Sequence, residues 1–176
     1  MPALVKRAMQ PWPPEAAYVD VQTLSTLRAQ VVRRALRDVC ILESPAGSNR
    51  SPLIDVYLRR AHVPESLITT GKGWYCASWA GAVFVDAGAL VPSDYGSCDA
   101  WLPFLEPASY VPQTGDAVLY GVKGDAHHIG IVLVPTPRIT MEANRSLKDQ
   151  GNNGIGIFVG PSTRTDVLGY VQPRQL

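Results

Sequence analysis

At 176 residues the chain fits one domain, and with 46% hydrophobic and 18% charged residues it can bury an ordinary core. Its 16 lysines and arginines against 15 acidic residues give a formal charge of +1. This balance excludes a whole-chain attraction to nucleic acid or acidic lipid, so any binding has to come from a local site. The three cysteines, Cys40, Cys76 and Cys98, suit neither a disulfide framework nor paired zinc half-sites. We therefore expect reduced thiols, no metal and no cofactor.

The first twenty residues are rich in proline and are expected to form an extended arm ahead of a single domain over residues 21–176. They contain no apolar run long enough for a signal peptide, and no later segment suits a membrane span. We therefore expect synthesis in the cytoplasm and no membrane partner.

Three helices are expected in the first half of the chain. Residues 21–42 place apolar side chains at helical spacing with arginines between them, which we interpret as a solvated basic face. Ser51 and Pro52 offer a cap and a first-turn proline for a short helix through Leu58. Residues 75–87 are apolar on almost every side and stop at Gly88, so the third helix should be buried.

Beyond Pro112 the pattern changes to short β-like runs separated by Gly, Pro and Asn, at residues 117–120, 129–134, 139–143, 155–159 and 168–171. Helices that precede strands, rather than alternate with them, are typical of an α+β domain. We expect the N-terminal helices to pack on one side of a small antiparallel sheet.

Cys76 falls in the first turn of the third expected helix. The partial positive charge of a helix N-terminus favours a thiolate, and the unpaired amides of the first turn can hold an oxyanion. A small buried core thiol is the alternative at this position. Cys40, late in a helix, and Cys98, in a loop, lack this setting.

A nucleophilic cysteine needs a base, and the histidines are His62, His127 and His128. His62 follows a helix without a partner suggested by pattern, so we interpret it as a surface or core residue. His128 opens a strand, and alternation leaves room beside it at Gly130. In the next strand, alternation turns Thr140, Glu142 and Asn144 to one face.

A three-residue turn at positions 135–137 would set His128 opposite Asn144, with Glu142 as a diagonal neighbour. A shift of two residues would put Glu142 opposite instead. Either register supplies an acceptor that can fix the histidine tautomer, the third role beside nucleophile and base.

Four motifs carry a resemblance to a known family: GWYCASW at residues 73–79, PQTGDAV at 112–118, HIGIV at 128–132 and EAN at 142–144. GSNR at residues 47–50, followed by Tyr57 and Leu58, resembles a leader segment seen in some members. In this order the motifs resemble CHAP domains, the cysteine, histidine-dependent amidohydrolases and peptidases related to NlpC-type papain-like hydrolases. The similarity spans about residues 43–171.

The resemblance implies a papain-like fold and cleavage of bacterial peptidoglycan, either between muramic acid and alanine or within the peptide stems and bridges. It implies Cys76 as nucleophile, His128 as base, and Glu142 with Asn144 as the orienting pair. Four further residues are candidates to line the substrate cleft: Trp74, Tyr75, Trp101 and His127. Many relatives place Trp directly before the cysteine, whereas Tyr75 intervenes here. Asp116 is expected to be structural rather than catalytic.

Two other functions are compatible with the same residues. A cysteine protease acting on protein would use the same three groups, and a non-catalytic adaptor of a phage particle would need the fold alone. Without a secretion signal, an enzyme of the cell wall would depend on a phage or a secretion apparatus for delivery. The Pro-rich arm is the expected docking element for such a partner.

Overall fold

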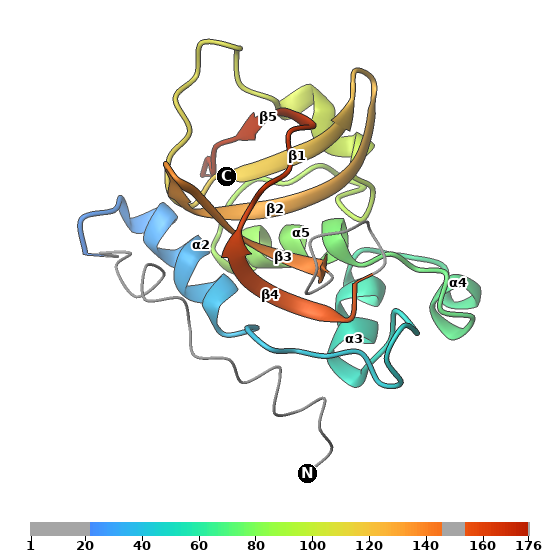
Figure 1. Cartoon of the computed structure of the whole chain (residues 1–176). Helices are drawn as coiled ribbons and strands as arrows, with labels where there is room; N and C mark the ends of the chain where they lie inside the picture. Colours follow the sequence, from blue (N-terminus) through green and yellow to red (C-terminus); the bar gives the residue numbers. More distant parts are fainter. Residues whose placement is uncertain (1–21, 146–153, 176) are drawn as a thin grey trace.

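The computed structural model describes residues 22–145 and 154–175, so the expected arm at residues 1–20 lies outside the described residues. Four α-helices and a 3-10 helix come first in the described part, and strands follow (Figure 1). In chain order the elements are α2 (Thr26–Leu36), α3 (Pro52–Arg60), α4 (Glu65–Thr69), α5 (Cys76–Asp86), η2 (Asp99–Phe104), β1 (Ala117–Val122), β2 (Asp125–Pro135), β3 (Arg138–Arg145), β4 (Gly156–Pro161) and β5 (Val167–Val171).

The helix ends follow local capping signals. Ser51 accepts a hydrogen bond from the amide of Ile54 at 3.3 Å, and Pro52 occupies the first turn of α3, as the sequence predicts. The helix α5 ends at Asp86, two residues before Gly88, whose φ of +78° suits only a residue without a β-carbon. The helix α2 is shorter than expected at both ends, since Ser25 caps its start and it ends at Leu36. The helix α4 was not predicted.

The sheet is antiparallel, with strand order β4-β3-β2-β1-β5. Four of the five expected β-like runs lie within its strands, and the run at residues 155–159 overlaps β4 from Gly156 onward. The chain is therefore a mixed α+β domain. The helix α5 packs against the central strands β2 and β3 (Figure 1). The small side chains of Ala77 and Ala80 are buried in the same core, whereas Gly81 leaves room for the ring of Tyr95. A second, smaller apolar cluster on β1 and β2 joins Val118 and Val132.

The connection between β2 and β3 differs from the expected three-residue turn. Pro135 pairs with Arg138, so two residues form the turn, and a register shift follows between Val132 and Val134. This irregularity adds one residue to β2 and restores the pairing of Gly130 with Glu142. The pairing of the two strands ends there, so Glu142 lies diagonal to His128, and Asn144, with a φ of +58°, does not pair across from it.

Asp116 anchors the start of the sheet. Its fully buried carboxylate accepts hydrogen bonds from the amide of Gln113 at 2.7 Å, from Arg28 at 2.6 Å and from the hydroxyl of Tyr110 at 3.0 Å. The structural interpretation of Asp116 is therefore confirmed. The solvated basic face predicted for residues 21–42 is wrong at Arg28, which is 9% exposed and forms this ion pair.

Candidate functional site

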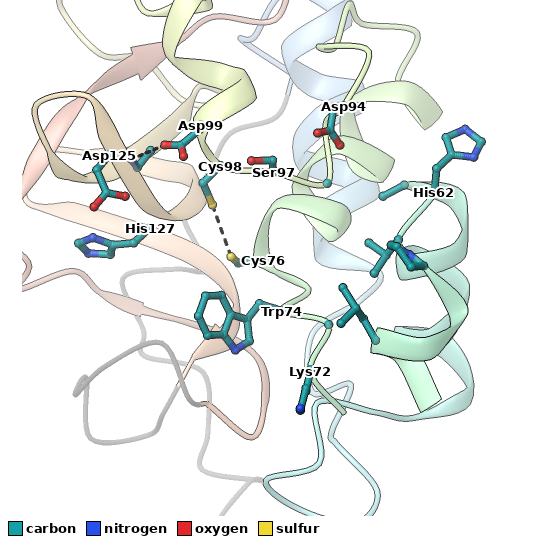
Figure 2. A pocket seen from close by; sticks show the side chains of 17 residues that line it. His62, Lys72, Trp74, Cys76, Asp94, Ser97, Cys98, Asp99, Asp125 and His127 are labelled. Atoms are coloured by element: carbon teal, nitrogen blue, oxygen red, sulfur yellow. Dashed lines mark hydrogen bonds between the residues drawn. The ribbon is translucent and has the colours of Figure 1, made fainter. Parts of the chain in front are cut away.

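Cys76 is the first residue of α5 and lies beneath a surface cleft. Tyr75 precedes it as the N-cap, and its side chain does not cap the helix. The amide of Ala77, in the first turn of α5, donates a hydrogen bond to the sulfur, and this end of the helix favours a negative charge. The residue is only 4% exposed, but it lines a cleft of about 560 Å³ (Figure 2).

His128 and Glu142 form a buried pair on neighbouring strands. Nε2 of His128 lies 2.9 Å from Oε2 of Glu142, and both side chains are 2% exposed. Nδ1 of His128 is also buried and makes no hydrogen bond to the described residues. This contact leaves Nδ1 as the ring nitrogen that can exchange a proton.

Two hydroxyl groups hold Glu142 in place. Thr140, two residues earlier on the same face of β3, donates to its Oε1 at 2.5 Å, and Tyr120 donates to the same atom at 3.1 Å. Tyr120 lies on β1 directly across from His128 and stacks against the imidazole at a tilt of 34°. The carboxylate therefore has partners for both oxygens, and its orientation toward His128 is constrained.

The charges of Cys76 and His128 stabilise each other. A hydrogen bond from Cys98 and the proximity of His128 lower the pKa of the Cys76 thiol well below its usual value, although burial opposes this. Burial disfavours the imidazolium, yet Cys76 and Glu142 outweigh it and raise the pKa of His128 to about 9. Burial would also raise the pKa of Glu142, but His128 lowers it to about 2. These shifts favour a thiolate at Cys76, an imidazolium at His128 and a carboxylate at Glu142.

Asn144 is placed differently from its expected role. Its side chain is buried, but Oδ1 accepts a hydrogen bond from the amide of Gly154 at 2.9 Å rather than from His128. Nδ2 of Asn144 has no partner among the described residues. Of the two candidate orienting residues, Glu142 therefore contacts the histidine, and Asn144 secures the end of β3.

Tyr75 is fully buried and does not line the cleft, which corrects its assignment as a substrate-binding residue. Its hydroxyl donates to Oε1 of Glu43 at 3.1 Å, and Oε2 of Glu43 accepts from the amide of Asn49 at 3.0 Å. Asn49 in turn donates to the carbonyl of Gly71. The leader segment thus supports the loop that delivers Cys76.

The two tryptophans proposed to line the cleft differ in exposure to solvent. Trp74 is 61% exposed, and its ring lies beside Cys76 on the cleft wall (Figure 2). Trp101 is fully buried, packs edge-on against Phe84 and donates to the carbonyl of Tyr95. The assignment of Trp101 to the substrate cleft is therefore wrong: it belongs to the core.

His127 lines the cleft, but its ring points away from Cys76 (Figure 2). Its Nε2 lies 3.0 Å from Oδ2 of Asp166 and 2.8 Å from a guanidinium nitrogen of Arg164. Through these contacts the imidazole of His127 is bound to Asp166 and Arg164 rather than to Cys76. The exposed His62 lies at another edge of the same cleft.

The cleft is acidic. Its wall includes Asp94, Asp99 and Asp125 against the single lysine Lys72 (Figure 2). One carboxylate oxygen of Asp99 already accepts a hydrogen bond from the amide of Ala126 at 2.7 Å.

Sequence reasoning missed three contributors to the site: Cys98, Tyr120 and Glu43. Tyr120 could have been found, because alternation on β1 and an antiparallel pairing of β1 with β2 place it across from His128. No local pattern links Cys98 to Cys76 or Glu43 to Tyr75, since each contact joins distant loops and helices.

A scan of protein-family models and a search of curated protein sequences each found no significant match to this chain. Within the described residues, no helix is long and apolar enough to cross a membrane. The same part of the chain contains no cluster of three or more His, Cys, Asp or Glu side chains suited to a metal ion.

Proposed function

We propose that this chain is a cysteine hydrolase that cleaves an amide bond, with Cys76 as nucleophile, His128 as base and Glu142 as the residue that orients the base. The observation that carries the proposal is the buried pair of His128 and Glu142, which leaves the other ring nitrogen without a partner among the described residues, while Cys76 helps to raise the pKa of the imidazole. A structural thiol needs no such arrangement. A buried histidine bound to a buried carboxylate beside a thiol in the first turn of a helix is the arrangement that activates a cysteine.

The reaction follows from these positions. The Cys76 thiolate attacks the carbonyl carbon of the amide, and the first amides of α5 receive the developing oxyanion. His128 protonates the leaving amine through Nδ1 as the carbon–nitrogen bond breaks. The imidazole then takes a proton from water, which hydrolyses the thioester and regenerates the thiolate. Glu142 keeps Nε2 protonated, so that Nδ1 carries the proton exchange.

We further propose a papain-like fold and peptidoglycan as the substrate, on the strength of the motif resemblance. The bond is either the link between muramic acid and alanine or one within the peptide stems and bridges. An exposed Trp74 on an open cleft of about 560 Å³ is compatible with a polymer that carries sugars. Delivery to the wall, by a phage or a secretion apparatus, belongs to this proposal.

The test is digestion of purified sacculi, with mass spectrometry of the released fragments. Wild type and Cys40→Ser should release muropeptides whose masses identify the cleaved bond, whereas Cys76→Ala should release none. Folded Cys76→Ala with undiminished digestion would contradict the proposal. A folded wild type that leaves sacculi intact but cleaves unfolded protein substrates would favour a cysteine protease, and inactivity on both would favour a non-catalytic adaptor.

A further inference from the structure

A second thiol lies against the candidate nucleophile. Sγ of Cys98 is 3.7 Å from Sγ of Cys76, although the two residues are 22 positions apart. Cys76 begins α5, and Cys98 directly precedes η2. Figure 2 shows the two sulfur atoms facing each other, and both residues line the same cleft. The pair is therefore within reach of a small reagent that enters the cleft.

The two thiols differ in charge. The hydrogen bond from Cys98 and the imidazolium of His128 lower the pKa of Cys76, whereas the hydrogen bond to Cys76, together with burial, raises the pKa of Cys98. Cys76 therefore carries the negative charge and Cys98 the proton. An oxidant reacts with the thiolate first, and a neighbouring thiol can then displace the oxidised group.

We propose that Cys76 and Cys98 are a redox modification site, in which a hydroperoxide converts the pair into a reversible disulfide and so removes the attacking sulfur. From the proposed function, the inference takes only the thiolate character of Cys76, and it does not depend on the identity of the substrate. The sulfur atoms are already in contact, whereas the bond requires them to approach to about 2.05 Å.

The chemistry occurs in two steps. The Cys76 thiolate attacks one oxygen of the hydroperoxide, and a sulfur–oxygen bond forms as the oxygen–oxygen bond breaks. The leaving alkoxide or hydroxide takes a proton from the imidazolium of His128 and departs as alcohol or water, and His128 regains a proton from solvent. The sulfur of Cys98 then attacks the Cys76 sulfenic acid, a sulfur–sulfur bond forms as the sulfur–oxygen bond breaks, and water leaves with the proton of Cys98. The pair loses two electrons in total, and the hydroperoxide gains them. A dithiol reductant returns both cysteines to the starting state.

Cys98 has a second consequence in this scheme. A sulfenic acid without a neighbouring thiol is oxidised further to a sulfinic acid, which dithiols do not reverse. Cys98 therefore converts a permanent loss of the nucleophile into a reversible one.

The experiment treats the full chain with a few-fold molar excess of hydrogen peroxide, because the sulfinic acid needs two equivalents of oxidant. It then alkylates the remaining thiols and identifies the products by peptide mass spectrometry. Wild type and the matched control Cys40→Ser should yield a peptide pair linked through Cys76 and Cys98, which dithiothreitol separates. Cys98→Ser should instead accumulate sulfinic acid at Cys76 and stay modified after dithiothreitol. Cys98→Ala provides the same comparison with a different side chain.

Two results would overturn the inference: sulfinic acid at Cys76 of the wild type without a linked peptide, or links to Cys40 as frequent as links to Cys98. Near-ultraviolet circular dichroism checks that each variant is folded. Because the readout is the thiol chemistry itself, it needs no wall substrate. A linked pair in a protein that leaves sacculi intact would reject only the proposed function, and an active enzyme without the link would reject only this inference.

Discussion

Nε2 of His128 lies 2.9 Å from Oε2 of Glu142, and the two side chains bring opposite charges together beneath the sheet surface with almost no contact with water. Thr140 and Tyr120 fix the carboxylate from its other oxygen. This geometry makes the orientation and the charge of His128 depend on Glu142, and it determines how the following variants should behave.

Replacement of Glu142 by Gln should remove the negative charge while it keeps the size of the side chain. The pKa of His128 should fall, and the hydrolysis rate should fall by about 10²-fold or more, the usual range for loss of acid–base catalysis. Thr140→Val, which removes only one hydrogen bond to Glu142, should cost less. Amide hydrolysis rates and NMR titration of the imidazole measure both effects, and an unchanged imidazole pKa in Glu142→Gln would contradict the role assigned to the carboxylate.

Activity should show a bell-shaped dependence on pH. The acid limb should lie well below pH 9, because the pKa of Cys76 is lowered, and activity is lost as the thiolate takes up a proton. The alkaline limb should lie near pH 9, where His128 loses the proton that the leaving amine needs. Alkylation by iodoacetamide at varied pH reports the acid limb alone. In His128→Ala this limb should move upward, and a limb that stays in place would show that the imidazole does not stabilise the thiolate.

Thermal stability should fall at low pH in a way that depends on Glu142. Folding lowers its pKa from 4.5 to about 2, so the unfolded chain binds more protons in this interval. The stabilisation is present above pH 4.5 and is lost as the pH falls through 2. Unfolding temperatures between these values should decline more steeply in wild type than in Glu142→Gln, and parallel curves would argue against a native-state pKa this low.

Gly130 should not tolerate a side chain. A β-carbon there would lie 2.5 Å from Cγ of Glu142, so Gly130→Ala should displace the carboxylate and cost about 1–3 kcal/mol of stability. Gly160→Ala is a matched control on β4, where the nearest atom to the new carbon would be 3.5 Å away. Chemical denaturation and amide hydrolysis assays compare them. Equal activity in the two variants would show that Glu142 does not need its observed position.

Replacement of Trp74 should affect substrate binding, whereas replacement of Trp101 should affect stability. Trp74→Ala removes an exposed ring from the cleft, so it should raise KM and leave the unfolding free energy nearly unchanged. Trp101→Ala empties part of the core and should cost about 3–5 kcal/mol. Steady-state kinetics and chemical denaturation measure the two effects. A Trp74→Ala variant with normal KM would remove this side chain from the substrate contacts.

Several features of the site follow from local sequence. The loop ending near Gly73, the apolar run after it and the stop at Gly88 predict that a helix begins beside Cys76, and α5 does begin there. The two-residue period of strands places His128 and Glu142 on the same face of the sheet, because successive side chains of a strand alternate between faces. Both signals depend on neighbouring residues only, so a single sequence carries them.

Tertiary structure decided which of the candidate side chains contact one another. Glu142 lies diagonal to His128 in the observed register, and its side chain rather than that of Asn144 reaches the imidazole, because Asn144 binds the amide of Gly154. Packing also buried Trp101 while it left Trp74 exposed. The contact of Cys98 with Cys76 joins positions 22 residues apart, and that of Arg28 with Asp116 joins positions 88 apart. The periods of helices and strands predict which face of its own element a side chain lies on, whereas such contacts depend on how whole elements pack against one another. The sequence therefore determined where a thiol and an imidazole present themselves, and the packing of α5 and its loops on the sheet decided what surrounds them.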